Sequence, residues 1–194
     1  MVINTKIVLS SASILASLAI ISVATFAYFS NQGTSNDNVF AAGTLDLKLS
    51  DNTPETDQDN VTASFGGTNL APGASVSGQL RLKNTGSIAA SHAEVALVNT
   101  NSDITNPLDK VLELTTLDYG GVSVLSQVIN NNGNGWTDLD DLKSSGLDNL
   151  ALTDLNTNHN LDLTVTFRSD AGNEYQGDSV DSDWTVTLNQ DASQ

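Results

Sequence analysis

Apolar and polar residues alternate along several short stretches of the chain, which is the pattern of β-strands with one buried face. The clearest case is residues 74–83, where Ala74, Val76, Leu80 and Leu82 are separated by polar side chains. The other stretches with this period, or with a strand-like apolar pattern, are residues 40–49, 89–98, 112–117, 161–167 and 184–188. Turn-forming Gly, Asn, Asp and Pro residues separate them. The pattern therefore predicts an all-β protein.

Two stretches differ from this pattern. Residues 137–142 place Leu139 and Leu142 on one side of a helix that would begin at Thr137 and end at Gly146, so a short helix is predicted there. Residues 122–129 are apolar without a clear period, and a strand and the start of a helix both remain open.

The N-terminal residues have the pattern of a targeting signal. Lys6 precedes an uncharged apolar run at residues 7–27, and Thr25-Phe26-Ala27 places small residues at the two positions that a signal peptidase reads. We expect residues 1–27 to be a signal peptide that signal peptidase removes after Ala27, so that the protein meets the membrane only before cleavage. The alternative is an uncleaved anchor, because a bilayer-spanning helix needs roughly 20 apolar residues.

The amino-acid composition excludes some classes of function and favours others. The 194 residues include 7 Lys+Arg and 23 Asp+Glu, a net charge of −16, and such a surface repels nucleic acid. It suits a high-salt habitat or calcium binding. The chain has no cysteine, which excludes thiolate metal sites and thiol catalysis. No long linker interrupts residues 39–194, so one domain is expected there.

Between signal and domain lies a polar arm, residues 28–38, with the sequence Y-F-S-N-Q-G-T-S-N-D-N. This segment is too polar to form a core by itself. Either it has no fixed structure or it becomes ordered by adding a strand to another sheet.

Four sequence pieces carry a resemblance to a known family: residues 27–30 (A-Y-F-S), residues 38–47 (N-V-F-A-A-G-T-L-D-L), L-A-P-G at 70–73 followed by K-N-T-G-S at 83–87, and residues 172–179 (G-N-E-Y-Q-G-D-S). In this order they resemble TasA-type biofilm fibre proteins, their camelysin relatives and the related archaeal bundling pilins. The acidic surface is closer to the archaeal branch.

The resemblance implies a single jelly-roll-like β-sandwich, with short helices in its loops, that polymerises head to tail. The N-terminal arm of one subunit would complete the sheet of the next by donor-strand complementation, because an added strand satisfies an open sheet edge. We therefore expect a structural subunit of a biofilm-matrix or cell-surface fibre or pilus, secreted, whose partner is another copy of itself. The expected polymerisation residues are Tyr28, Phe29, Ser30, Asn31, Gln32, Gly33 and Thr34.

Catalysis is not expected, although camelysin relatives are described as metallopeptidases. The chain has no H-E-x-x-H helix and no G-x-S-x-G turn, and its two histidines, His92 and His159, lie in different contexts. His92 shares the polar face of a predicted strand with Glu94 and is interpreted as an exposed residue without a ligand role. A secreted metallopeptidase and a membrane-anchored binding domain remain the alternatives.

No cofactor is predicted, and calcium is the one alternative. Oxygen-bearing side chains recur at every second position of one loop, a spacing found in calcium loops, although the Gly and the Glu of an EF-hand are missing. These are Asp154, Asn156, Asn158, Asn160 and Asp162. A solvated turn is the preferred interpretation, also for a second group, Asn132, Asn134 and Asp138. Asn60 begins the sequence's N-x-S/T glycosylation motif.

Overall fold

The computed structural model describes residues 5–6, 9–15, 42–51, 56–62 and 65–191. The chain divides into two units, residues 1–41 and 42–194, which are treated separately. In the first unit, residues 5–6 and 9–15 are helical. Among the described residues, no helix combines the length and apolarity that a membrane crossing requires. The predicted cleavage point after Ala27 and the arm at 28–38 lie outside the described residues.

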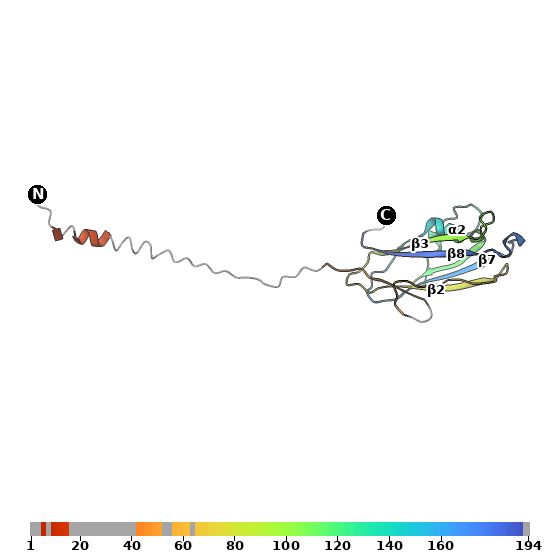
Figure 1. Cartoon of the computed structure of the whole chain (residues 1–194), viewed down its shortest axis with the longest axis horizontal. Helices are drawn as coiled ribbons and strands as arrows, with labels where there is room; N and C mark the ends of the chain where they lie inside the picture. Colours follow the sequence, from red (N-terminus) through yellow and green to blue (C-terminus); the bar gives the residue numbers. More distant parts are fainter. Residues whose placement is uncertain (1–4, 7–8, 16–41, 52–55, 63–64, 192–194) are drawn as a thin grey trace. The chain divides into compact units, whose positions relative to one another are not determined.

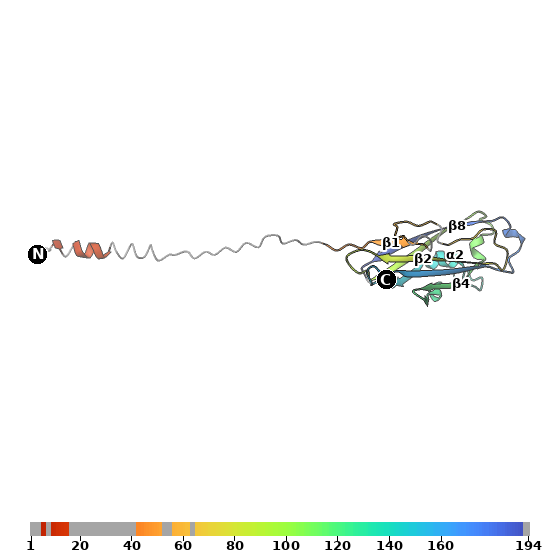
Figure 2. The ribbon, with the colours of Figure 1, turned by 90° about the horizontal axis from the view of Figure 1, so that it is seen from below.

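The second unit is a β-sandwich (Figure 1), which confirms the predicted all-β class. One sheet has five strands in the order β1-β2-β7-β4-β5, and the other has three in the order β6-β3-β8. Figure 2 shows β1, β2 and β4 from a second direction. The strands are β1 (Leu47–Ser50), β2 (Ser75–Asn84), β3 (His92–Asn101), β4 (Leu112–Tyr119), β5 (Val122–Ser123), β6 (Leu147–Leu150), β7 (His159–Phe167) and β8 (Val180–Asn189).

The alternating side chains of both sheets meet in one core. From the five-stranded sheet, Leu82, Leu117 and Leu161 are fully buried, and from the other sheet Ala93 and Leu150 are at most 2% exposed. Full burial of a leucine is worth about 1.5–3 kcal/mol, so this core is the main source of stability in a chain without disulfides.

The first strand is shorter than the predicted stretch of residues 40–49. Before β1 the backbone pairs with the turn that follows β2: the Ser87 and Thr85 amides donate to the carbonyls of Thr44 (2.9 Å) and Asp46 (2.7 Å). Gly86 permits this contact, because a side chain there would collide with the Thr44 carbonyl. The K-N-T-G-S motif therefore fixes the point at which the chain enters the sandwich.

A short helix, α2 (Leu139–Ser145), lies close to its predicted place, but its cap is Asp138 and not Thr137. The Asp138 carboxylate accepts from the amide of Asp141 (3.0 Å), and the Asp141 carboxylate accepts from the amide of Asp138 (3.2 Å). This reciprocal capping box satisfies two backbone amides at the start of the helix. Leu139 and Leu142 face the core as predicted.

The remaining helical turns lie in loops: η1 (Leu108–Lys110), η2 (Leu125–Gln127) and η3 (Asn173–Tyr175). The ambiguous stretch at residues 122–129 contains both β5 and η2, which explains why it has no single period. Strand β6 has no counterpart among the predicted strands.

Candidate functional site

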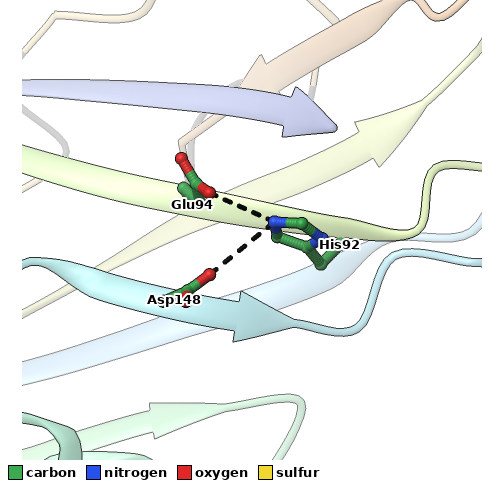
Figure 3. Close-up of side chains that lie close together, drawn as sticks. All are labelled: His92, Glu94 and Asp148. Carbon is green, nitrogen blue, oxygen red and sulfur yellow. Dashed lines mark hydrogen bonds and ion pairs between the residues drawn. The ribbon is translucent and has the colours of Figure 1, made fainter. Parts of the chain in front are cut away.

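Three side chains that can bind a metal converge on the outer face of the three-stranded sheet (Figure 3). The Nε2 atom of His92 lies 3.1 Å from Oε1 of Glu94 and 3.6 Å from Oδ1 of Asp148. The three donor atoms all lie within 4.8 Å of one another. His92 and Glu94 come from β3, and Asp148 comes from the neighbouring strand β6.

Strand periodicity explains the first pair. Ala93 and Val95 point into the core, with exposed fractions of 0% and 3%, so His92 and Glu94 both point outward. The sequence predicted this shared face correctly.

A β-bulge explains the third member. Ala93 pairs with Leu150 and Val95 with Leu147, so two steps on β3 match three steps on β6. The extra residue lies where Asn149 adopts the left-handed conformation, with φ of 56°. Leu147 and Leu150 both stay in the core, and Asp148 is turned toward His92. Bulges commonly redirect a side chain in this way.

The surroundings of His92 differ from the sequence expectation of an exposed residue. Its side chain is only 6% exposed, whereas those of Glu94 and Asp148 are 45% and 42% exposed. The side-chain nitrogen of Asn189, on β8, lies 3.4 Å from His92 Nε2. The imidazole is therefore held in place by its neighbours, while the two carboxylates remain accessible to solvent.

The second histidine is not part of this cluster. His159 begins β7 in the five-stranded sheet and stacks on the ring of Tyr119, with ring centroids 5.8 Å apart. Its Nε2 atom is buried and has no hydrogen-bond partner among the described residues. The separation of the two histidines agrees with the sequence interpretation.

The candidate calcium residues divide between a loop and a strand. Asn160 and Asp162 lie on the outer face of β7, where the Asp162 carboxylate accepts from the side-chain amide of Gln79. Asp154, Asn156 and Asn158 are exposed in the preceding loop. For Asn160 and Asp162, the alternate spacing is thus that of a strand.

The second oxygen-rich group does come together, but around a helix cap. Asn132 and Asn134 donate from their amide nitrogens to the Asp138 carboxylate, at 3.1 and 2.6 Å. Burial raises the pKa of Asp138 above its usual value, against the effect of these hydrogen bonds. Because the amides present nitrogen and not oxygen, the group is arranged as a capping network.

A different kind of site is the outer edge of β8, which ends the three-stranded sheet and pairs with β3 alone among the strands that the structure describes. Ten consecutive residues of β8 pair with β3 without a register shift, and β8 contains neither proline nor lysine. Native edges are commonly protected by short length, bulges, proline or lysine. Among the described residues, such protection of this edge is limited to Asp181, Asp183 and the ring of Phe65, whose centroid lies 4.7 Å from that of Trp184.

The orientation of the β8 backbone follows from two hydrogen bonds at its ends. The Ser102 amide donates to the carbonyl of Ser179, and the Ser91 amide to that of Asn189. The backbone amide and carbonyl groups of the odd-numbered β8 residues therefore point toward β3. Those of the even-numbered residues point toward the outer edge. The same even-numbered residues supply the inward side chains Val180, Trp184, Val186 and Leu188, which pack on the core but are only partly buried.

The predicted polymerisation residues, Tyr28 to Thr34, lie outside the described residues. Asn60 is described and exposed in the connection between β1 and β2.

One comparison with known proteins gives a match. A family model described as camelysin metallo-endopeptidase matches residues 2–194. A search of curated proteins finds no match. The match supports a secreted or cell-surface protein. Because it spans nearly the whole chain, it confirms the family predicted from the sequence motifs: the chain belongs to the camelysin family.

Proposed function

We propose that this protein is the structural subunit of an extracellular fibre, in which the arm at residues 28–38 of one copy pairs with β8 of the next. The observation that carries the proposal is the β8 edge. Its ten residues keep a regular register with β3, their outward backbone groups pair with no other strand of the described residues, and their apolar stripe is only partly buried. An added strand would satisfy the backbone groups and cover the stripe.

The charges favour an arm over a second β8 as the partner. Two β8 edges brought together would bring together like-charged strands that carry Asp181 and Asp183. The arm carries a single charged side chain, Asp37, and its eleven residues span about 36 Å when extended, enough to run along β8.

The course of the chain gives the direction of assembly. The segment at Thr44 lies beside Ser87, and β1 begins opposite Asn84. β8 ends at the same end of the sandwich, where Asn189 pairs with His92. In a head-to-tail filament of equally oriented copies, the arm would enter its neighbour at Val180 and run antiparallel to β8.

Peptide complementation tests the arm. Chains that begin at residue 39 are expected to stay monomeric, and a synthetic peptide of residues 28–38 is expected to bind them and to cap them against polymerisation by the longer chain. A peptide with the same composition in scrambled order is the control. Fibres that grow equally well from chains lacking the arm would refute the proposal.

The family description favours a second candidate, a metallopeptidase that uses the cluster of His92, Glu94 and Asp148. These donors suit a divalent cation, but one imidazole is fewer than the two or three nitrogen ligands of typical hydrolytic zinc sites. We therefore rank it second. Casein cleavage that is lost with a chelator and in His92→Ala, but retained in His159→Ala, would favour it over the fibre subunit.

A further inference from the structure

We propose that His92, Glu94 and Asp148 form a site for one divalent transition-metal ion, of the zinc class, which joins β6 to β3. The proposal does not depend on fibre assembly or on catalysis. It concerns what the cluster binds and which strands the ion would hold together.

The first argument is geometric. An ion with tetrahedral ligands at about 2.1 Å keeps those ligands about 3.4 Å apart. The two distances from His92 Nε2, 3.1 Å to Glu94 and 3.6 Å to Asp148, lie on either side of this value. The donor atoms are thus close to the spacing that a bound ion needs.

The second argument is electrostatic. Glu94 and Asp148 direct two carboxylates at one imidazole nitrogen, and a single N–H cannot donate well to both. No lysine or arginine forms an ion pair with Glu94 among the residues that the structure describes. A divalent cation would neutralise both carboxylates and bind the nitrogen at the same time.

The third argument is the local architecture. The bulge around Asn149 directs Asp148 toward β3, and the Gln127 side chain fixes the strand there by accepting from the Asp148 amide at 2.9 Å. His92 is held in a buried position, and the half-exposed carboxylates leave a path for an ion. The Asp148 carboxylate also accepts from the backbone amide of Asn149 (2.6 Å) and from its side-chain nitrogen (3.3 Å). His92 and Asp148 are therefore preorganised, and Glu94 remains adaptable.

The ligand atoms, one imidazole nitrogen and two carboxylate oxygens, indicate which ion would bind. An imidazole nitrogen favours zinc, cobalt or nickel over calcium and magnesium, which prefer oxygen ligands. β6 has only four residues and forms the edge of its sheet opposite β8. An ion shared by Asp148 and β3 would fasten this short strand.

The test is a metal titration of the full chain after removal of metals with a chelator. We expect Zn²⁺ and Co²⁺ to bind one ion per chain, with Co²⁺ giving a visible absorption spectrum of a site with a nitrogen ligand. Ca²⁺ and Mg²⁺ should bind at least tenfold more weakly. Saturating Zn²⁺ should raise the thermal midpoint by several degrees, since a ligand of the folded state stabilises it.

Substitutions place the ion at the cluster. His92→Ala should abolish high-affinity binding, and Glu94→Gln and Asp148→Asn, which keep the side-chain shapes, should each weaken it at least tenfold. His159→Ala is the matched control, because it removes the other histidine from the other sheet, and it should bind Zn²⁺ as the unchanged chain does. Absence of Zn²⁺ binding, equal affinity for Ca²⁺, or unchanged binding in Glu94→Gln and Asp148→Asn would overturn the proposal.

Discussion

Replacement of Ser182 by proline tests the role of the β8 edge without altering the pairing between β8 and β3. Ser182 is even-numbered, so its amide points to the free edge and has no role in the β3 ladder. Proline is tolerated at such edge positions because it removes only an amide that faces solvent. In a fibre, the same amide would meet the incoming arm.

The expected loss of binding free energy follows from the backbone hydrogen bonds that the β8 edge can form. The five even-numbered residues of β8 offer about ten backbone groups, each worth about 0.5–1.5 kcal/mol net when paired, whereas ordering the eleven residues of the arm costs about 1–2 kcal/mol per residue. Backbone pairing alone is therefore marginal. Proline removes one hydrogen bond and leaves a carbonyl of the arm without its donor, a loss of about 2–4 kcal/mol.

We expect Ser182→Pro to raise the concentration needed for fibre growth by about 30-fold or more, since 1.4 kcal/mol corresponds to a factor of ten. Ser182→Ala is the matched control. Both variants lose the hydrogen bond from Ser182 Oγ to Asn99 Oδ1 (2.8 Å), but the alanine variant keeps the amide. The assay is sedimentation of the processed chain over a concentration series.

Denaturant unfolding of both variants as monomers checks that the fold is retained, with stabilities expected within about 1 kcal/mol of each other. Val180→Pro, at the first residue of β8, is a second variant with the same logic. Fibre growth of folded Ser182→Pro at the same concentration as Ser182→Ala would refute the assignment of β8 as the acceptor edge.

Two predictions concern the sandwich itself. Asp138→Ala should lower the free energy of unfolding by about 2–4 kcal/mol, because it removes the α2 cap and the charged acceptor of the Asn132 and Asn134 side-chain amides. Denaturant unfolding measures this loss. A loss below about 0.5 kcal/mol, the size expected for the exposed control Ser144→Ala, would contradict it. Burial raises the pKa of Tyr119, so its contribution to stability is complete below the unfolded pKa of about 10 and falls as the pH rises further, by at most about 1.4 kcal/mol per pH unit. Tyr119→Phe should lower the free energy of unfolding by about 1 kcal/mol at neutral pH, because it removes the hydrogen bond to the Ala151 carbonyl (2.9 Å). Its stability should also decline less steeply above pH 10. Thermal unfolding between pH 7 and 11 checks both results, and an unchanged alkaline slope would disprove the second.

The sequence predicted what depends on local periodicity. The alternation through Leu80 and Leu82 defines β2, and the same period places His92 and Glu94 on one face. The fold class and the family followed from such patterns and motifs.

What it could not predict depends on contacts between distant residues. Leu147 and Leu150 are three positions apart, a spacing that does not indicate a strand unless a bulge is allowed. β6 and the position of Asp148 beside His92 were therefore missed. The local signals of an irregular strand were the residue types Gly146 and Asn149, which tolerate positive φ and adopt it here. The burial of His92 and the edge position of β8 arise from pairing order, which no local pattern encodes.

The most direct test of the central claim is electron cryomicroscopy of the fibre formed by the processed protein. Our account predicts that residues 28–38 of each copy lie as a strand beside Val180–Asn189 of the next copy, antiparallel to it, with all copies in the same orientation. Fibres in which residues 28–38 contact only their own copy, or in which β8 stays at a free edge, would contradict it.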